Sequence, residues 1–497
     1  MTGGTQFLRY SKAAFHLVCS YAGVLLVVPL ASVMARRAIA FQEAGGVDEL
    51  LQMVQQWRES SGSPWVAVGV AAAALMALQV MLAALYYLIM RRRSEICLVD
   101  FYSYRPPDRM NCIPKLLIQG AKRSNLYTER SLEFMENVIR ISGIGEPQGF
   151  LPDEFQEGVY REMVHSIANK RAETELALFT CVQKVLDKTG LKAKDVDALI
   201  TNCCTFNPVP SLSAAVVNHF KMKQSVKTYH IGGMGCAASV IAMDLAQELL
   251  KNHPNWRVVI AGSDNCLETV YYGNQRNMLI TNCLFRLGGV AAVLSNHPAD
   301  RKIAKYRLDH LVRTHLGADD AAYNCVIQKD DEEGKIGTKI GREVMETAGK
   351  ALKANITAIG PLVLPLSEKL IFVGNLFARK VLGLKSIKPY TPDFKTAFEH
   401  FCIHPGGKTV IEGVGSQLGL RPSQLLPMLR PFERYGNTSS SSTWYAWSFV
   451  ETCQGVKRGQ RLWQLSFGSG FKCASAAWTA LRDCDEQHDA WTETPSC

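Results

Sequence analysis

Thr228-Tyr-His-Ile-Gly-Gly-Met-Gly-Cys236 leads into residues 237–250, where apolar residues recur at helical spacing. The glycines predict a tight turn, and the periodic run predicts a helix over residues 236–252. A cysteine at this junction faces the unpaired N–H groups and the dipole of a helix start, which favour a thiolate. We therefore expect Cys236 to have a depressed pKa and to act as a nucleophile.

Two other interpretations of this stretch remain open. Free cysteine is commonly a small buried hydrophobe, so Cys236 can also be a structural residue beside a packing turn. The glycines could instead form a phosphate-binding loop, but their spacing fits neither G-x-G-x-x-G nor the P-loop.

Composition bounds the class of protein. The chain has 497 residues, of which 47% are hydrophobic and 20% charged, so it is an ordered protein with room for two or three domain-sized units. The net charge is +10, but no lysine–arginine run dominates it, which argues against a nucleic-acid-binding protein. A basic balance suits a phosphate-bearing substrate or an anionic membrane face. The 15 cysteines form no C-x-x-C pair, which argues against a disulfide framework or structural zinc and favours a reducing compartment.

The first 96 residues predict a membrane region. Residues 13–35 carry no formal charge apart from a possible one on His16, and residues 65–90 carry none, so both are long and apolar enough to span a bilayer. Trp65 and residues 91–93, three arginines, frame the second span as they do in transmembrane helices. Two spans place both ends of the chain on one side, and the arginine balance favours the cytosol. Two buried core helices are the alternative.

The remaining chain alternates apolar runs with helical patterns, which predicts an α/β protein with largely parallel, covered sheets. The acidic residues 483–497 are expected to form a solvated tail. Strands are expected near residues 196–202, 256–262, within 277–294, 307–313 and 462–467, and helices over 155–188, 236–252, 341–354, 408–418 and 441–454.

Two further stretches contain candidate site residues. A strand-like run ends at His404, before a Pro-Gly-Gly turn that would let the imidazole project into a cleft. His400 lies four residues earlier, but no H-E-x-x-H glutamate or third ligand accompanies the pair, so we predict no metal site. Asn437 precedes four serines that could cap a helix. A satisfied core histidine and a solvated capping loop are the alternatives, but cysteine, histidine and asparagine together form a nucleophilic set.

In these stretches the chain resembles the plant-type 3-ketoacyl-CoA synthases, the condensing enzymes of very-long-chain fatty acid elongation. The resemblance extends from about residue 97 to 480, and that family also carries a double membrane span ahead of it. The matching stretches are Val99-Asp-Phe-Tyr-Ser-Tyr-Arg-Pro-Pro, Phe206-Asn-Pro-Val-Pro-Ser, Gly232-Gly-Met-Gly-Cys, Thr281-Asn-Cys-Leu-Phe-Arg, Val312-Arg-Thr-His-Leu-Gly-Ala-Asp, Phe401-Cys-Ile-His, Gly436-Asn-Thr-Ser and Phe467-Gly-Ser-Gly-Phe-Lys-Cys.

The resemblance implies a thiolase-like fold of two similar βαβαβαββ halves, residues 97–300 and 301–482, in a homodimer. The stretches around Cys236 and His404 would then be pseudo-equivalent. The family's nucleophile falls on Cys236, its active histidine on His404 and its asparagine on Asn437. His315 and His400 match two further histidines of the family.

Other positions follow the family or depart from it. Phe285 falls where related condensing enzymes separate the CoA passage from the acyl pocket. Ser469 and Gly470 match the oxyanion loop. Glu433 stands where the family commonly has a histidine, and Pro405 replaces a usual alanine.

The implied reaction joins acyl-CoA and malonyl-CoA into 3-oxoacyl-CoA, with loss of CO2 and CoA and without a cofactor. The implied location is the endoplasmic reticulum membrane, with the catalytic part in the cytosol beside a ketoreductase, a dehydratase and an enoyl reductase. A type III polyketide synthase-like enzyme and a non-catalytic elongase subunit are the alternatives. A thiolase is excluded, because its second cysteine has no counterpart ahead of the Phe467-Gly-Ser-Gly turn.

Overall fold

The computed structural model describes residues 76–82, 95–111, 113–145, 151, 166–384 and 387–492, and the chain divides into two units, Met1–Arg93 and Ser94–Cys497. In the first unit only residues 76–82 are described, and they are helical with exposed side chains. The rest of the two predicted spans, residues 13–35 and 65–90, lies outside the described residues. Within the described part of the chain, no helix combines the length and apolarity needed to cross a bilayer.

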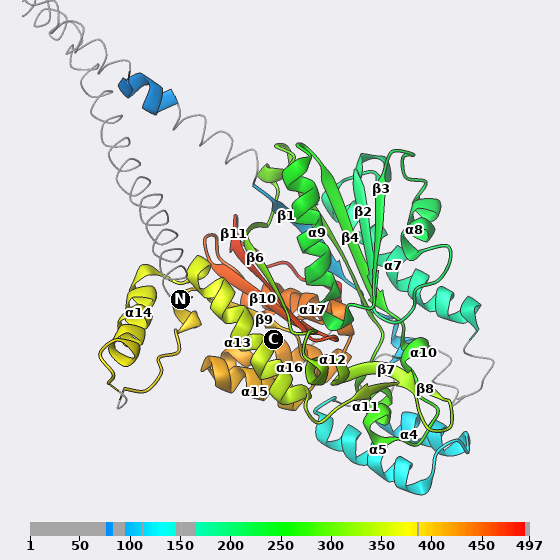
Figure 1. Cartoon of the computed structure of the whole chain (residues 1–497). Helices are drawn as coiled ribbons and strands as arrows, with labels where there is room; N and C mark the ends of the chain where they lie inside the picture. The colour runs from blue at the N-terminus through cyan, green and yellow to red at the C-terminus, as the bar shows by residue number, and fades with distance from the viewer. Residues whose placement is uncertain are drawn as a thin grey trace, which may run out of the picture. The chain divides into compact units, whose positions relative to one another are not determined.

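The second unit contains two successive sets of elements (Figure 1). The first set is β1 (Cys97–Ser103), α4 (Pro114–Arg123), α5 (Glu129–Ser142), α7 (Ile167–Thr189), β2 (Ala198–Cys203), α8 (Leu212–Phe220), β3 (Lys227–Gly232), α9 (Ala238–Asn252), β4 (Arg257–Asp264), α10 (Cys266–Thr269), α11 (Arg276–Leu284) and β5 (Gly288–Ser295). The second set is β6 (Tyr306–His315), α12 (Asp320–Asn324), β7 (Val326–Asp330), β8 (Ile336–Ile340), α13 (Val344–Val363), α14 (Leu366–Lys380), β9 (His400–Ile403), α15 (Lys408–Leu418), α16 (Pro422–Tyr435), α17 (Ser442–Phe449), β10 (Arg461–Gly468) and β11 (Lys472–Ala480).

Nine of these strands form one mixed sheet in the order β3-β2-β4-β5-β1-β6-β11-β10-β9. Only β2/β3, β2/β4 and β9/β10 pair in parallel, and the five other pairs are antiparallel. The prediction of largely parallel sheets is therefore wrong. Helices cover both faces, so antiparallel strands such as β5 also read as continuous apolar runs, and such runs do not reveal strand direction.

The two sets repeat one strand order around the β1/β6 seam. Outward from the seam the first half runs β1, β5, β4, β2, β3, and the second runs β6, β11, β10, β9. By this order β9 is the counterpart of β2, and α17 is the counterpart of α9. Among the described residues, the second half has no strand in the place of β3. There Asn437 forms only an isolated bridge to Phe285, so the predicted second βαβαβαββ half is incomplete.

The sheet alternates side chains between two buried layers. Ile200 and Ile260 face a cluster that includes α9, whereas Leu199 and Val259 face a cluster that includes α7 and α8. This period of two is the pattern expected of strands covered on both faces. Ser166 caps the start of helix α7 by accepting a hydrogen bond from Asn169 N, and the left-handed Gly190 follows the end of the helix.

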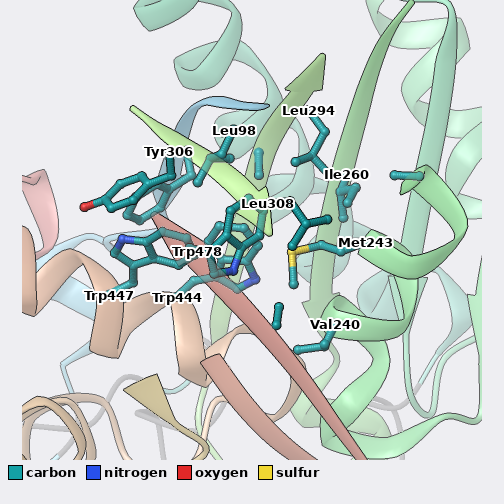
Figure 2. Close-up of a cluster of buried hydrophobic side chains, with 14 of the residues drawn as sticks. Leu98, Val240, Met243, Ile260, Leu294, Tyr306, Leu308, Trp444, Trp447 and Trp478 are labelled. Atoms are coloured by element: carbon teal, nitrogen blue, oxygen red, sulfur yellow. The ribbon is translucent and has the colours of Figure 1, made fainter. Parts of the chain in front are cut away.

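The two halves meet in an aromatic core (Figure 2). Trp444 and Trp447 of α17 stack with ring centroids 5.4 Å apart, and both are fully buried beside Trp478 and Tyr306. Every residue of α17 is buried, so this helix is held by packing on all sides rather than by an amphipathic face. Truncating one of these indoles to alanine costs about 3–5 kcal/mol.

Several predicted elements are confirmed, and others differ in extent or type. Helix α15 has the predicted bounds, and α9 begins two residues after Cys236. Helix α13 extends to Val363, because Asn355, Ile359 and Val363 continue its buried face beyond residue 354. The strand expected within residues 277–294, around Gly288-Gly289, is confirmed by β5, whereas residues 276–284 ahead of it form α11. This helix packs on both α5 and β8, so its burial on more than one face hides the helical period.

The acidic C-terminal segment is packed rather than solvated over its described part, residues 483–492. Glu486 pairs with Lys305 at 2.5 Å, and Lys305 also contacts Glu451 at 2.8 Å and Asp100 at 3.0 Å. His488 meets the same Glu451 at 2.7 Å. Burial would raise the pKa of Glu451, but Lys305 and His488 lower it to about 2. The acidic residues therefore complete a buried ion network, which a count of charges along the sequence cannot show.

Cysteine usage differs slightly from the prediction. Eleven described cysteines are free thiols, whereas Cys453 takes part in a disulfide bond.

Candidate active site

The turn that carries Cys236 depends on glycine. After β3, Gly233 and Gly235 adopt φ values of 67° and 62°, and a 3-10 turn, Gly235–Ala237, precedes α9. A Cβ on Gly235 would lie 2.5 Å from the backbone nitrogen of Ser469. Glycine at this position therefore permits both the left-handed backbone and the close approach of the Ser469 loop.

Cys236 is half-buried, and its thiol is uncharged. Burial raises its pKa to about 12, and the negative charge of Asp264 acts in the same direction. The hydroxyl of Ser439 donates to Cys236 Sγ at 3.5 Å, which only partly offsets the effect of burial. The predicted depression of the Cys236 pKa is therefore wrong for this structure. Desolvation outweighs the helix start, and no cation is among the groups that shift this pKa.

His404 lies one residue beyond β9. Its backbone N–H still bonds to Leu465 O at 2.8 Å, so the sheet fixes its position, while the following turn frees the side chain. The imidazole is 4% exposed, and its Nδ1 has no hydrogen-bond partner among the described residues. Burial lowers the pKa of His404 to about 3, so the ring is neutral at physiological pH.

The orientation of the Asn437 carboxamide is fixed by its neighbours. Asn437 Oδ1 accepts a hydrogen bond from Ser439 N at 2.8 Å, and Nδ2 donates to Gly406 O at 3.3 Å. Its backbone bonds to Leu284 and Arg286 on the first half. The oxygen is thereby occupied, and the NH2 group lies beside the His404 turn with one N–H left to donate.

The structure brings these three side chains to one cavity. Cys236, His404 and Asn437 all line a space of about 330 Å³, together with Phe285 and Ser469. The cysteine comes from the first half of the fold, and the histidine and asparagine come from the second. A neutral thiol, a neutral imidazole and an oriented amide at one cavity wall are suited to acyl transfer followed by stabilisation of an oxyanion or enolate.

This cavity is mainly apolar and adjoins a second, more polar one of about 510 Å³. Cys236, Phe285 and Ser469 line both, so the Phe285 ring lies where the two spaces meet. The apolar cavity is walled by Val138, Ile141, Ile280, Leu284, Val344, Met345, Ala348, Val410, Phe467 and Phe471. The polar cavity includes Cys204, Thr205, Asp264, Thr281, His315, Gln328, Thr338, Gly470 and Lys472.

His315 belongs to the polar cavity and not to the apolar one. It is exposed at the end of β6, where its Nδ1 accepts from Gly317 N at 2.8 Å. Burial, together with the charges of Lys472 and Arg313, lowers the pKa of His315. These three basic residues also border a neighbouring recess of about 370 Å³, together with Asp244, which pairs with Arg313 at 2.7 Å.

Ser469 and Gly470 form the turn between β10 and β11. Lys472 Nζ donates to Ser469 O at 2.7 Å, and Gly470 has a φ of 104°. The Ser469 backbone nitrogen thereby lies close to Gly235, beside Cys236. The backbone N–H groups of Cys236 and Ser469 are therefore the natural donors to an oxyanion formed at the sulfur.

Three other predicted or noted positions lie apart. His400 is at the far end of β9, bonds to Gln460 Oε1 at 3.0 Å and lines neither cavity. Glu433 pairs with Arg430 at 2.7 Å on α16, also away from both. Pro405 is buried in the turn after His404.

Sequence patterns missed two functional neighbours of Cys236. Ser439 has a φ of 52°, unusual for a non-glycine residue, and contacts both Cys236 and Asn437. Asp264 accepts from Ser440 N at 3.0 Å and also from Cys204 N. The serines looked like helix caps, yet no serine side chain caps α17. Only the tertiary contact distinguishes Ser439 from the serines around it.

A cluster of possible metal ligands is already engaged. Glu451, Glu486 and His488 place one ligand atom each within 4.8 Å of one another. The Lys305 ammonium lies 2.8 Å and 2.5 Å from the two carboxylates, so a protein cation holds the place that an ion would take.

The chain matches known protein families over most of its length. Residues 87–381 match the FAE1/Type III polyketide synthase-like protein family, and residues 395–480 match the 3-Oxoacyl-[acyl-carrier-protein (ACP)] synthase III C terminal family. The chain is 40% identical to 3-ketoacyl-CoA synthase 2 of Arabidopsis thaliana over 490 residues, 98% of this chain and 89% of that protein. It is 43% identical to 3-ketoacyl-CoA synthase 5 of the same plant over 405 residues, 81% of each chain.

Solved structures confirm the thiolase-like α/β fold. CsyB complexed with CoA-SH superposes with a TM-score of 0.62 at 17% identity, covering 78% of this chain and 100% of that one. The 1,3,6,8-tetrahydroxynaphthalene synthase of Streptomyces coelicolor A3(2), a bacterial type III polyketide synthase, gives 0.59 at 18% identity, with 78% and 99% covered. At these identities the likeness establishes the fold alone.

Proposed function

This chain belongs to the 3-ketoacyl-CoA synthase family and is therefore a condensing acyltransferase of very-long-chain fatty acid elongation, and we propose how its own residues carry the reaction. The reaction converts acyl-CoA and malonyl-CoA into 3-oxoacyl-CoA, CO2 and CoA. The observation that carries the proposal is the convergence of Cys236, His404 and Asn437 on one cavity wall.

The first half-reaction loads the acyl group onto Cys236. The thiol is neutral at rest, so its proton passes to the neutral His404 imidazole as the sulfur attacks the thioester carbonyl. The backbone N–H groups of Cys236 and Ser469 hold the tetrahedral oxyanion. CoA then leaves as a thiolate and recovers the proton from His404. Loss of one oxyanion donor typically costs about 2.7–4 kcal/mol of barrier.

The second half-reaction uses the same cavity for malonyl-CoA. Decarboxylation releases CO2 and leaves an enolate, whose oxygen receives hydrogen bonds from His404 and from Asn437 Nδ2. The enolate carbon attacks the acyl thioester, the 3-oxoacyl-CoA forms, and Cys236 leaves as a thiolate that takes up a proton from solvent. An asparagine suits this role because it donates a hydrogen bond without adding negative charge where negative charge forms.

The two cavities divide the substrate between them. The apolar cavity suits the acyl chain, and the polar cavity suits the pantetheine arm, with Phe285 at their junction. Arg313, His315 and Lys472 would face the phosphate-bearing end of CoA. His400 has no direct role in this scheme.

Purified full-length protein, acyl-CoA and labelled malonyl-CoA provide the test. We expect release of CO2 and formation of one 3-oxoacyl-CoA per malonyl-CoA. A cyclised product of several malonyl additions would indicate a polyketide synthase activity, which the resemblance in fold leaves as the second candidate. No CO2 with any acyl-CoA tried would indicate a non-catalytic elongase subunit.

The cellular setting is also part of the proposal. Residues 13–35 and 65–90 would form a hairpin in the endoplasmic reticulum membrane, with residues 97–300 and 301–482 as a homodimeric catalytic part in the cytosol, beside the ketoreductase, dehydratase and enoyl reductase of elongation. Asn355 and Asn437 both stand in glycosylation sequons, and both are buried, which suits a part that avoids the lumen. Protease accessibility in sealed microsomes would test this orientation: protection of the catalytic part would overturn it.

A further inference from the structure

Helix α14 has an unusual distribution of exposed apolar residues. Leu366, Leu370 and Val381 are 69%, 63% and 66% exposed, and Phe377 is 52% exposed. These belong to a run of exposed apolar side chains on α14 and the segment after it. The full set is Leu366, Leu370, Ile371, Phe372, Val373, Leu376, Phe377, Val381, Leu382 and Leu384. Contiguous exposed patches of this kind mark interaction surfaces, whereas scattered exposed apolar residues do not.

Helix α14 contacts the rest of the protein through polar side chains. Glu368 is its one buried residue, and its carboxylate accepts from Tyr390 OH at 2.7 Å and from Asp393 N at 3.0 Å. Asn375 donates to Lys388 O at 3.0 Å and accepts from Tyr390 N at 3.1 Å. The polar contacts therefore fix the helix against residues 387–393 and leave its apolar side chains outside. A helix on the surface of a water-soluble domain shows the opposite arrangement.

Charge indicates what covers this face. Residues 366–388 contain Glu368 as their one acidic residue, and that carboxylate is buried. Lys369, Arg379, Lys380, Lys385 and Lys388 are basic. A second copy of the same face would bring two positive patches together, whereas a bilayer with anionic lipids offers both hydrocarbon and negative charge.

Length excludes a spanning role. Helix α14 has 15 residues, fewer than the roughly 20 needed to cross a bilayer, so it suits a position in the plane of the interface. Figure 1 shows α14 at the margin of the second unit, beyond α13 and away from the sheet. We propose that α14 and residues 381–384 form an interfacial membrane anchor that inserts its apolar face into the cytosolic leaflet of an anionic bilayer.

The anchor would act through α13. Val344, Met345 and Ala348 of α13 wall the apolar cavity, and α13 continues through Pro365 into α14. An anchored α14 thus connects the bilayer to the wall of the acyl cavity. The proposal does not depend on the condensation chemistry, so either can fail without the other.

Photolabelling of the full-length protein tests the anchor. The protein is reconstituted into vesicles containing a photoreactive phosphatidylserine, and labelled peptides are mapped by mass spectrometry. We expect label on residues 366–384, falling about tenfold in the double variant Leu370→Glu, Phe377→Glu, which adds two charges to the apolar face. The exposed control Ile303→Glu, outside this face, should leave that label unchanged.

A second variant tests the charge contribution without changing the apolar face. Lys380→Glu, Lys388→Glu should reduce labelling about fivefold or more in anionic vesicles and much less in neutral ones. All variants should keep wild-type thermal unfolding and CO2 release in detergent. Unchanged labelling in the Leu370→Glu, Phe377→Glu protein, or cross-linking of α14 to α14 of a second copy in place of lipid, would overturn the proposal.

Discussion

The two halves of the fold place different chemistry at the same topological position. In the first half, β3 ends in the glycine turn that presents Cys236 ahead of α9. In the second half, a 3-10 turn, Ser439–Ser441, follows Asn437 and leads into α17 without a preceding named strand. Cys236 and Asn437 are thus the pseudo-equivalent pair, whereas His404 follows β9, the counterpart of β2, and corresponds to Cys204. The predicted equivalence of the Cys236 and His404 stretches is therefore wrong.

This difference shows how a repeated fold becomes an asymmetric site. The first half keeps its outer strand, and the strand holds a turn that points sulfur into the cavity. The second half replaces that strand with backbone bonds from Asn437 to Leu284 and Arg286, which fix the carboxamide against the opposite half. Nucleophile and hydrogen-bond donor can then meet at the seam between the halves.

Removing the sulfur of Cys236 should have the largest effect on activity. Cys236→Ala should lower acyl transfer by more than about 10⁴-fold, because no other group takes the acyl chain. Thermal unfolding should change little, since alanine fits the turn. Intact-protein mass spectrometry after incubation with acyl-CoA would show the outcome, and an acyl adduct on the variant would contradict the assignment of Cys236.

The ion pairs of Lys305 between the two halves can be removed without changing a residue of the active site. Lys305→Met removes the buried cation that contacts Asp100 of the first half together with Glu451 and Glu486. Lys188 still holds Asp100 and Glu486, but the fully buried Glu451 keeps only His488 as a partner, which should cost about 3–5 kcal/mol of folding stability. Chemical denaturation measures this, with Lys251→Met, an exposed partner of Glu248, as the control expected to change little.

The substitution Asn437→Asp tests whether the Asn437 carboxamide stabilises the enolate by donating a hydrogen bond. A carboxylate cannot donate, and its charge opposes the enolate, so decarboxylation and condensation should fall about 10²–10³-fold while acylation of Cys236 falls far less. Rapid-quench measurement of both half-reactions separates these effects. An equal loss in both would assign Asn437 to positioning of Cys236 instead.

Local patterns predicted the parts of this site that depend on neighbours in sequence. The glycine turn before Cys236 and the strand end at His404 follow from residue types alone. The Cys236 pKa did not, because it depends on burial in the folded chain, and then on the hydrogen bond from Ser439 and the charge of Asp264, which come from elsewhere in the sequence. Strand direction was missed for a related reason: runs such as residues 290–294 are apolar throughout in either orientation when both faces are covered.

Alanine substitutions at two glycines of the Cys236 turn should have smaller effects, and these effects should differ from each other. Both Gly233 and Gly235 have positive φ, but a Cβ on Gly233 meets nothing within 4 Å, whereas one on Gly235 meets the Ser469 nitrogen at 2.5 Å. Gly233→Ala should cost about 1 kcal/mol of stability through backbone strain. Gly235→Ala should cost about 2–3 kcal/mol and also slow acylation, because it displaces an oxyanion donor. Equal effects on acylation would argue against Ser469 N–H as that donor.

The smallest effect is expected from pH over the physiological range. The pKa of His404 is lowered to about 3 and that of Cys236 raised to about 12, so neither group titrates in the folded enzyme between pH 6.5 and 9. Acylation should therefore stay nearly constant in this window. Outside it, stability should fall as pH drops from 6.5 toward 3, because unfolded His404 binds a proton that the folded ring does not.

The expected loss of folding stability at alkaline pH comes from release of a proton by the unfolded chain rather than from uptake of one. Above pH 9 the unfolded Cys236 thiol loses a proton that the folded thiol retains, so stability should fall as pH rises toward 12. His404→Gln should reduce only the acid limb, and Cys236→Ala only the alkaline limb, in denaturation curves recorded across pH. Neither limb should vanish, because the lowered pKa of Glu451 and the raised pKa values of thiols such as Cys97 and Cys283 also contribute. An acylation rate that rises through an apparent pKa near 7 would instead show that substrate binding brings the sulfur and the imidazole into an ion pair, which the buried neutral pair of the free enzyme does not form.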